Sequence, residues 1–202
     1  LDTLRQAWGI PEATRVVINV ARLTPWKGQR QLIDAAVRIA AQYPDVVFVL
    51  AGDDQGRSDY RAELDAKIGE HNLRDRIRLV GHVDDVPAAL ALAAVSFIAS
   101  TEPEAFGRAA AEAQAVGCPV IATRIGAAPE TVLAPPRVAA NARTGWLVPP
   151  GDIDAYQQAL REALELTPEE RAQLGARAMR RVRTEFSTLA MQQRTLTVYN
   201  EL

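Results

Sequence analysis

The stretch Val16-Val17-Ile18-Asn19-Val20-Ala21-Arg22-Leu23-Thr24-Pro25-Trp26-Lys27-Gly28 predicts a buried strand, a short loop with two cations, and the start of a helix. Five more apolar runs of strand length follow it along the chain. They cover residues 46–51, 77–80, 95–99, 120–123 and 146–148. Most of these runs are apolar at successive positions instead of alternating, which is typical of parallel strands covered by helices on both faces.

Helical patterns lie between and after these runs. Apolar residues recur at helical spacing over 32–43 and again over 156–164. Thr167-Pro168-Glu169-Glu170 forms a capping box with proline at the first helical position. The alternation predicts an α/β fold, a doubly wound parallel sheet with a helical C-terminal extension. Ligands of such sheets bind beyond the carboxyl ends of the strands, so the residues after each strand are the candidates for function.

The composition narrows the class of protein. The chain has 202 residues, of which 48% are hydrophobic and 24% charged, as in a folded globular domain. A net charge of -2 argues against a nucleic-acid binder. Cys118 is the only cysteine, which excludes an internal disulfide and fits a reducing cytoplasm. No apolar run is long enough to span a bilayer. The first residues lack a signal-peptide pattern and an initiator Met, so we expect a cytoplasmic protein cut from something longer.

The loop after the first strand carries Arg22 and Lys27 around a tight turn that ends at Gly28. Neither a Gly-x-Gly-x-x-Gly nor a Walker A pattern is present, which argues against a nicotinamide or flavin dinucleotide site. Such a loop can hold a diphosphate, with Arg22 forming a forked pair of hydrogen bonds and Lys27 acting as a point charge. By position alone, two solvated surface cations are the commoner outcome, because loops are usually polar.

The loop after the fourth strand, Ser100-Thr101-Glu102-Pro103-Glu104-Ala105-Phe106-Gly107-Arg108, precedes an alanine-rich helix whose free amides favour an anion. We place Glu104 just before that helix and Glu112 eight residues later. Eight helical residues rise about 12 Å. Glycosidase carboxylates lie roughly 5–9.5 Å apart, so two separate polar contacts are favoured over an acid/base pair. Alternatively, Glu104 compensates the helix dipole and Glu112 is an exposed helix charge.

These residues belong to a longer ordered set. It runs Arg22, Lys27-Gly28, Glu104-x-Phe106-Gly107, Glu112, Gly117-Cys118-Pro119-Val120-Ile121-Ala122, Gly126, Pro129-Glu130 and Thr144-Gly145-Trp146-Leu147-Val148-Pro149-Pro150-Gly151-Asp152. In this order the set resembles family-4-type retaining glycosyltransferases of the GT-B fold. Arg108 stands where the family often has leucine, Ala127 stands where a second glycine is common, and the loop over 135–143 is longer than usual.

The resemblance implies roles for particular residues. Arg22 and Lys27 would hold the donor diphosphate, and Glu112 would bind the ribose hydroxyls. Glu104, as the catalytic residue, would engage the sugar and phosphates together with the backbone of the residues at the helix start, namely Phe106, Gly107, Arg108 and Ala109. The donor would be a UDP-, GDP- or ADP-sugar, and the transfer would retain the anomeric configuration. The cations make a metal or other cofactor unnecessary.

The resemblance also implies that the donor and the acceptor bind to different domains. Enzymes of this fold have an N-terminal domain with the acceptor site, and this chain has no segment for it. We therefore expect residues 1–202 to be a single nucleotide-sugar-binding domain that is inactive without that N-terminal partner. Two alternatives remain, half of a nucleotide-sugar epimerase and a non-catalytic nucleotide-binding module.

Several other features have simpler interpretations. Asp152-Ile153-Asp154 matches an Asp-x-Asp metal motif, but Asp152 after Pro-Pro-Gly is expected to be a helix N-cap. Asp84 and Asp85 are expected to be caps as well. In the alternative view the turn over 81–85 walls the nucleotide base, where a carboxylate would favour guanine. His71 and His82 lack the spacing partners of a metal site.

A helix near the C-terminus combines a basic face with an apolar stripe. The basic residues are Arg177, Arg180, Arg181 and Arg183, and the stripe is formed by Leu174, Ala178, Val182 and Phe186. Such a helix could bring the full-length enzyme into peripheral contact with an anionic membrane. A packed helix with a solvated face is the favoured interpretation. Cys118 is expected to be a small buried apolar residue.

Overall fold

The structure, a computed structural model, describes residues 1–200 and contains a parallel sheet. Its strands are β1 (Arg15–Val20), β2 (Val46–Ala51), β3 (Ile77–Gly81), β4 (Val95–Ile98), β5 (Val120–Thr123) and β6 (Trp146–Val148). They coincide with the six predicted runs to within one residue at each end, which is the usual scatter of strand boundaries. The predicted α/β class is confirmed.

The sheet has the order β3-β2-β1-β4-β5-β6, with every neighbouring pair parallel. Strands β1 and β2 pair in register from Arg15 opposite Val46 to Val20 opposite Ala51. The chain moves outward from β1 to β3 and then returns to β4 on the other side of β1. The loops after β1 and β4 therefore leave the sheet in opposite directions, and the crevice between them is the expected ligand site of a doubly wound sheet.

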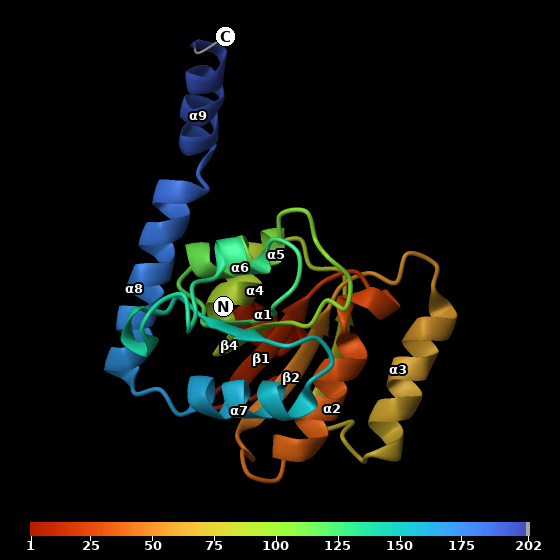
Figure 1. Ribbon diagram of the computed structural model, residues 1–202. Coiled ribbons are helices and arrows are strands. Elements are labelled where there is room, and N and C mark those ends of the chain that lie inside the picture. The colour runs from red at the N-terminus through yellow and green to blue at the C-terminus, as the bar shows by residue number, and fades with distance from the viewer. Residues whose placement is uncertain (201–202) are drawn as a thin grey trace.

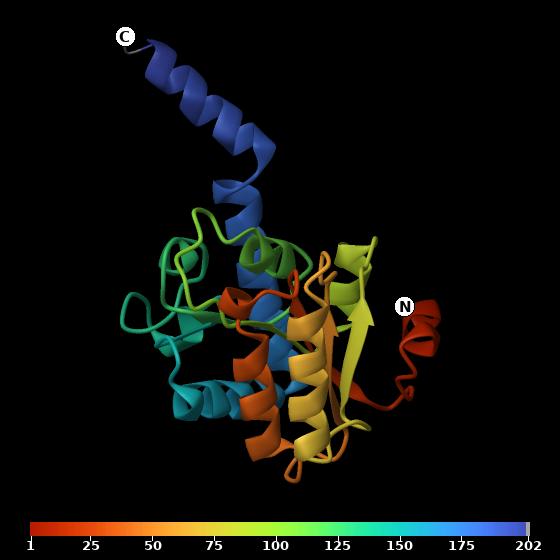
Figure 2. The same cartoon turned by 90° about the vertical axis from the view of Figure 1, so that its right-hand side faces the viewer.

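Helices cover both faces of this sheet (Figures 1 and 2). The α-helices of the described part are α1 (Asp2–Ala7), α2 (Gln29–Ile39), α3 (Ser58–Glu70), α4 (Val86–Leu92), α5 (Arg108–Ala115), α6 (Ala128–Thr131), α7 (Ile153–Leu164), α8 (Pro168–Glu185) and α9 (Thr188–Asn200). Two short 3-10 turns, η1 (Pro25–Lys27) and η2 (Ala140–Ala142), lie in loops. Helices α2, α3 and α7 share one apolar cluster with the sheet, and α4 and α5 share the other.

Successive residues of β1 supply both clusters. Val17 packs with the α2 side and Val16 and Ile18 with the α4 side, and all three are fully buried. Because side chains on both faces of β1 are apolar, the strand buries apolar surface against helices on each side of the sheet. This explains why the strand runs are continuously apolar and why the sheet can carry loops of polar residues at its ends.

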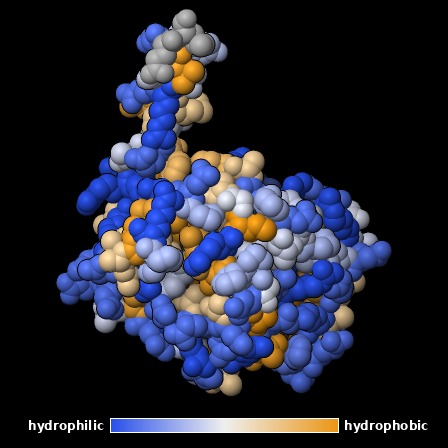
Figure 3. Space-filling model, in the orientation of Figure 1, coloured by the Kyte–Doolittle hydropathy of each residue, from blue (hydrophilic) through white to orange (hydrophobic). Residues whose placement is uncertain are grey.

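The C-terminal extension is helical, as predicted. Helix α8 begins with the expected capping box, in which Thr167 and Glu170 each bond the other's backbone amide, and it packs against α5. Helix α9 projects away from the body, and apolar side chains appear along it among hydrophilic ones (Figures 1 and 3). Its exposed large apolar residues are Leu189, Met191, Leu196, Val198 and Tyr199. Over residues 1–200, no helix has the length and apolar character needed to cross a membrane.

Candidate functional site

The loops after β1 and β4 touch each other beyond the carboxyl ends of the two strands. The amide of Thr101 donates to the carbonyl of Trp26 at 2.8 Å. Gly28 has a positive φ of 75°, and a Cβ at this position would lie 2.0 Å from the carbonyl oxygen of Ala99. Only glycine satisfies both the left-handed conformation and this close approach. The Lys27-Gly28 pair is therefore fixed by the contact between the two loops.

An ion pair joins the same two loops. Lys27 Nζ lies 2.9 Å from Glu104 Oε2, and the two side chains are only 15% and 18% exposed. The Ser100 hydroxyl donates to the other carboxylate oxygen, and Lys27 also lies over the Trp26 ring at 4.2 Å from its centroid. Partial burial strengthens this charge-assisted contact relative to a surface pair. Glu104 therefore holds the lysine in place from across the crevice.

The loop after β5 supports Glu104 from behind. The amide of Ala127 donates to the Glu104 carbonyl at 3.0 Å. Gly126 has a φ of 57°, and a Cβ here would lie 2.6 Å from both the nitrogen and the oxygen of Glu104. The close backbone contact explains the glycine at position 126. Ala127, where the resemblance predicts a second glycine, contacts Glu104 through its backbone amide.

Helix α5 starts at the last residue of the predicted loop, four residues after Glu104. Its N-cap is Gly107, with a φ of 72°, and its first residue is Arg108. Glu104 thus lies in the loop. The rise of eight helical residues used to separate it from Glu112 was wrong, because residues 105–107 are not helical. The amides of Ala110 and Ala111 both donate to the Gly107 carbonyl, so those of Arg108 and Ala109 precede the first bond within the helix. Amides in this position are suited to an anion.

The two glutamates have different partners. Glu112 lies one turn into α5 and pairs with Arg108 at 3.1 Å, with side chains 41% and 83% exposed. Exposed pairs of this kind contribute little to stability, about 0.3–0.5 kcal/mol. Glu104 is engaged by Lys27 and Ser100 instead. The structure therefore keeps the two carboxylates in separate contacts, and Glu112 is the one that a ligand can recruit at small cost.

Arg22 is exposed, and its guanidinium makes one long contact, 3.4 Å from Nη1 to the Gln55 side-chain oxygen. Its backbone is held more firmly. The amide of Leu23 donates to the Asp53 carbonyl at 2.9 Å, and the Arg22 carbonyl accepts from Gln29 Nε2 at 2.9 Å. The loop thus presents a cation whose backbone is fixed and whose donors are mostly available.

All of the predicted site residues line one hollow of about 580 Å³ at this edge of the sheet. Its lining comprises Val20, Ala21, Arg22, Lys27, Glu104, Ala105, Phe106, Gly107, Arg108, Ala109 and Glu112. The volume lies within the range of small-molecule sites, roughly 300–1,000 Å³. Phe106 also packs edge-on against Phe186, which follows α8, with ring centroids 5.7 Å apart. The structure therefore brings together every residue to which the resemblance assigned contact with the donor.

A second hollow of about 280 Å³ adjoins the first and shares Val20, Ala21 and Arg22 with it. Its other lining residues are Ala51, Gly52, Asp53, Gln55, His82, Val83 and Val86. The sequence analysis missed Asp53 and Gln55, although polar residues directly after a parallel strand were a usable signal. Gly52 is required here, because a Cβ would lie 1.9 Å from the Ala21 carbonyl oxygen.

The turn over 81–85 contributes His82 and Val83 to the second hollow but neither of its carboxylates. Asp85 caps α4 by accepting from the Ala88 amide at 2.9 Å, as predicted. The prediction that Asp84 is also a cap was wrong, since its carboxylate pairs with His82 at 3.1 Å on the exposed surface. Neither lines the second hollow, whereas Asp53 does. Among the described residues, Asp53 is therefore the carboxylate that lines the second hollow.

The remaining motifs behave as structural features. Asp152 caps α7 by accepting from the Ala155 amide at 2.9 Å, and Asp154 pairs with Arg38. Over residues 1–200, no cluster of three or more His, Cys, Asp or Glu side chains is arranged to hold a metal ion. Cys118 is buried, and burial raises the pKa of its thiol to about 12. That thiol is therefore neutral at physiological pH.

Two of the four arginines that form the predicted basic face of α8 are packed against the body. Arg177 donates to the Arg143 carbonyl at 3.1 Å, and Arg181 donates to the Glu130 carbonyl at 2.5 Å. Arg180 and Arg183 are exposed. This agrees with a packed helix that has a solvated face.

Comparisons with known proteins agree with this geometry. The family described as glycosyl transferases group 1 matches residues 2–181. A D-inositol 3-phosphate glycosyltransferase from Corynebacterium glutamicum is 32% identical over 98% of this chain and 46% of its own length. A GDP-mannose-dependent monoacylated alpha-(1-6)-phosphatidylinositol monomannoside mannosyltransferase from the same species is 30% identical over 94% of this chain and 48% of its own.

A solved structure extends the likeness to the fold. Anabaena Alr3699/HepE in complex with UDP-glucose superposes with a TM-score of 0.86 at 30% identity, over 100% of this chain and 52% of that one. This chain spans about half the length of the curated relatives that it matches.

Proposed function

This chain belongs to the glycosyl transferases group 1 family, and from that premise we propose that it is the donor-binding half of a retaining glycosyltransferase. The observation that carries the proposal is the 580 Å³ hollow, in which three cations, a helix N-terminus and two glutamates meet at the switch point of the sheet. The donor would be a nucleoside diphosphate sugar. The solved relative with UDP-glucose and the relative named for GDP-mannose both support this class of ligand.

In this proposal, neutralising the departing nucleoside diphosphate is the main task of the site. Arg22 supplies a forked set of donors, Lys27 a point charge, and the first amides of α5 a partial positive charge. These groups are already positioned before the reaction, so little reorganisation accompanies the growth of negative charge on the leaving group. Transition-state stabilisation would come from this arrangement, without a metal.

Glu104 has two assigned tasks here. Its carboxylate holds Lys27 at 2.9 Å, and its location in the same hollow lets it contact the donor sugar. The Ser100 hydroxyl and the support from Ala127 fix the orientation of the residue. Glu112 would bind the ribose hydroxyls, exchanging its exposed pair with Arg108 for hydrogen bonds to the nucleotide.

The nucleobase would occupy the adjoining 280 Å³ hollow, since Arg22 lies between the two hollows. The hollow offers apolar walls from Val20, Val83 and Val86 and polar groups from Asp53 and Gln55. The relatives name two different bases, uracil as UDP and guanine as GDP. UDP-, GDP- and ADP-sugars therefore remain the donors to compare.

The binding site for the acceptor would be supplied by another domain. Group relatives are about twice the length of this chain, and α9 carries five exposed large apolar side chains as it projects from the body (Figure 1). We propose that an N-terminal domain covers this side and closes over the donor. Transfer depends on holding two substrates in one geometry, an advantage worth up to roughly 7–11 kcal/mol. The isolated 202-residue chain should bind donor and transfer nothing.

The experiment is calorimetry on the purified chain with UDP, GDP and ADP, each paired with its monophosphate and nucleoside. We expect one diphosphate to bind best and the affinity to fall as each phosphate is removed. A companion assay measures released diphosphate from the donor sugar across a panel of acceptors. Equal affinity for a diphosphate and its nucleoside would overturn the donor site, and acceptor-dependent release by this chain alone would overturn the two-domain proposal.

A further inference from the structure

A fully buried glutamine lies directly beneath the loop that carries the two cations. Gln29, the first residue of α2, is 0% exposed. Its Nε2 donates to the Arg22 carbonyl at 2.9 Å, and its Oε1 accepts from the Tyr60 hydroxyl of α3 at 3.1 Å. Burial raises the pKa of Tyr60 to about 12, so this hydroxyl keeps its proton at neutral pH. Gln29 therefore connects α3 to the backbone of the site loop.

The cluster extends into the sheet through Asn19 of β1, which is 2% exposed. Its Oδ1 lies 3.4 Å from Gln29 Nε2, and its Nδ2 donates to the carbonyl of Phe97 in β4 at 2.8 Å. Buried amides cost free energy unless they are hydrogen-bonded, and an apolar side chain would avoid that cost. Two amides at this place in an otherwise apolar core therefore point to a positional role.

The geometry of one peptide unit shows what that role is. The carbonyl of Arg22 and the amide of Leu23 belong to the same planar peptide. Gln29 holds the carbonyl end, and the Asp53 carbonyl holds the amide end at 2.9 Å. Because the peptide is planar, two anchors at opposite ends fix its rotation. Without Gln29 the amide anchor alone remains, and the carbonyl end of the peptide can turn, which changes the direction in which Arg22 leaves the backbone.

The side chain of Arg22 cannot compensate for that loss. Its only side-chain hydrogen bond among residues 1–200 is the 3.4 Å contact with Gln55, which is long and exposed. Lys27, by contrast, has Glu104 and the Trp26 ring to hold it. Arg22 thus depends on the backbone anchors for its orientation more than Lys27 does.

We propose that Gln29 is a positioning residue that sets Arg22 for the diphosphate while touching no ligand itself, with Tyr60 and Asn19 fixing the orientation of its amide. This inference rests on the proposed donor site. It assigns the specificity for the diphosphate group to a buried cluster of α2, α3 and β1. Neither the sequence motif nor the hollow's lining includes any of these three side chains.

The test is Gln29→Met, which keeps a similar volume and removes both hydrogen-bonding groups. The probe is whichever of UDP, GDP and ADP binds the unmodified chain best, measured beside its nucleoside. Losing one neutral hydrogen bond of the usual strength should weaken diphosphate binding by roughly five- to tenfold, and nucleoside binding should change less than twofold. Tyr60→Phe removes only the outer bond, so its effect on the same ratio should be smaller and of the same sign.

Gln114→Met is the matched control. Gln114 is also 0% exposed, and its Nε2 donates to the carbonyls of Ala110 and Thr131, which do not line the 580 Å³ hollow. This variant should lose stability in thermal unfolding and keep the ratio of diphosphate to nucleoside affinity. A general loss of packing would move both glutamine variants alike, whereas a positioning role moves the ratio only for Gln29.

Three results separate the possibilities. A ratio that falls for Gln29→Met and holds for Gln114→Met supports the inference, and Tyr60→Phe decides it if Gln29→Met fails to fold. A ratio that stays at the original value in the Gln29 and Tyr60 variants, or falls equally in the control, overturns it. If the unmodified chain shows no preference for diphosphate over nucleoside, the proposed donor site itself fails.

Discussion

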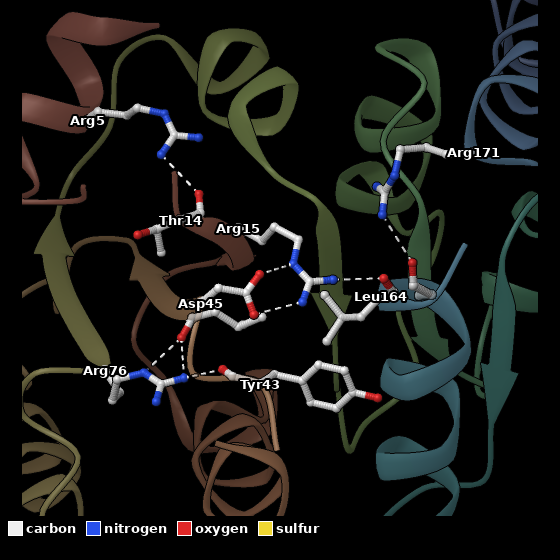
Figure 4. A network of polar contacts seen from close by, with 10 residues as sticks. Arg5, Thr14, Arg15, Tyr43, Asp45, Arg76, Leu164 and Arg171 are labelled. Atoms are coloured by element: carbon white, nitrogen blue, oxygen red, sulfur yellow. Dashed lines mark hydrogen bonds and ion pairs between the residues drawn. The ribbon is translucent and has the colours of Figure 1, made fainter. Parts of the chain in front are cut away.

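Three arginines at the amino edge of the sheet, where the strands begin, differ from two at the carboxyl edge, where the strands end, in how their donors are used. At the amino edge, the guanidinium groups of Arg15, Arg76 and Arg171 are bound to the protein's own oxygens (Figure 4). At the carboxyl edge, Arg22 and Arg108 are exposed and make one contact each with other side chains. The residue type is the same, and the difference is whether its donors are already used within the fold.

The amino edge shows how completely the fold can use the hydrogen-bond donors of an arginine. Arg76 precedes β3 and donates to the carbonyls of Val46 at 2.9 Å, Tyr43 at 2.6 Å and Ala40 at 3.1 Å. Arg15 donates to Asp45 at 2.9 Å and to the carbonyl of Leu164 at 2.8 Å. These bonds engage backbone carbonyls near the ends of α2 and α7 and at the start of β2.

The contrast shows that arginines near a sheet edge do not by themselves indicate a binding site. An arginine whose five donors are bound to carbonyls contributes to stability, and one with available donors next to a hollow is suited to a ligand. The parallel sheet decides which edge is which, since loops diverge only at the carboxyl ends of β1 and β4.

The largest expected effect comes from removing both cations of the carboxyl edge. Arg22→Ala with Lys27→Ala should weaken nucleoside diphosphate binding by at least about a hundredfold, because each charge-assisted bond typically contributes about 1.5–3 kcal/mol. Nucleoside binding should change little. Calorimetry with both ligands measures the effect, with Arg183→Ala as an exposed-arginine control. Equal losses for the two ligands would remove these residues from the diphosphate site.

A smaller effect is expected for Glu112→Gln. If the carboxylate accepts hydrogen bonds from the ribose hydroxyls, ribonucleotide affinity should fall by roughly tenfold, a typical value for a charged acceptor. The 2′-deoxy analogue has less to lose and should suffer less. The measurement is the preference for ribose over deoxyribose in each protein. A variant with an unchanged preference would exclude this role for Glu112.

The amino edge predicts a pH effect on stability. The hydrogen-bonded Arg15 guanidinium lowers the pKa of Asp45. A lowered pKa gives stability that is present above the unfolded-state value, about 3.9, and is lost as the pH falls through the folded-state value. The Arg15 and Asp45 side chains are 34% and 47% exposed, so solvent screening limits the contribution of the pair to stability to about 0.5 kcal/mol.

Asp45→Asn isolates this contribution. The variant should be less stable than the unmodified chain at pH 7, and the two should converge as the pH approaches 3. Urea unfolding at several pH values measures the difference. A difference that stays constant down to pH 3 would show that the Arg15–Asp45 pair contributes nothing through its charge.

The affinity for the donor is not expected to change when metal is removed. If Arg22, Lys27 and the α5 amides neutralise the diphosphate, a chelator should leave donor binding as it was. Calorimetry with and without chelator makes the comparison. Loss of binding with rescue by a divalent ion would show that cations of the carboxyl edge are insufficient.

Much of the fold was predictable because its determinants are local. Continuous apolar runs identified the strands, and their alternation with helical patterns identified a doubly wound sheet. The candidate residues lay where that sheet places ligands. The contacts that fix the two edges were not predictable, since Arg15 and Leu164 at the amino edge are 149 positions apart and Gln29 and Tyr60 near the carboxyl edge are 31 apart. The non-helical path of residues 105–107 also escaped prediction, because it depends on Gly107 adopting a left-handed conformation.

The central claim is that arginines at the amino edge contribute to stability and Arg22 at the carboxyl edge contributes to binding. Measuring both quantities for one substitution at each edge tests this claim. Arg22→Ala and Arg76→Ala are each examined for free energy of unfolding in urea and for diphosphate affinity by calorimetry. We expect Arg22→Ala to lose roughly tenfold or more in affinity and less than about 0.5 kcal/mol in stability. Arg76→Ala should lose about 2–3 kcal/mol in stability and less than about twofold in affinity. Equal effects of the two substitutions on both quantities would contradict the account.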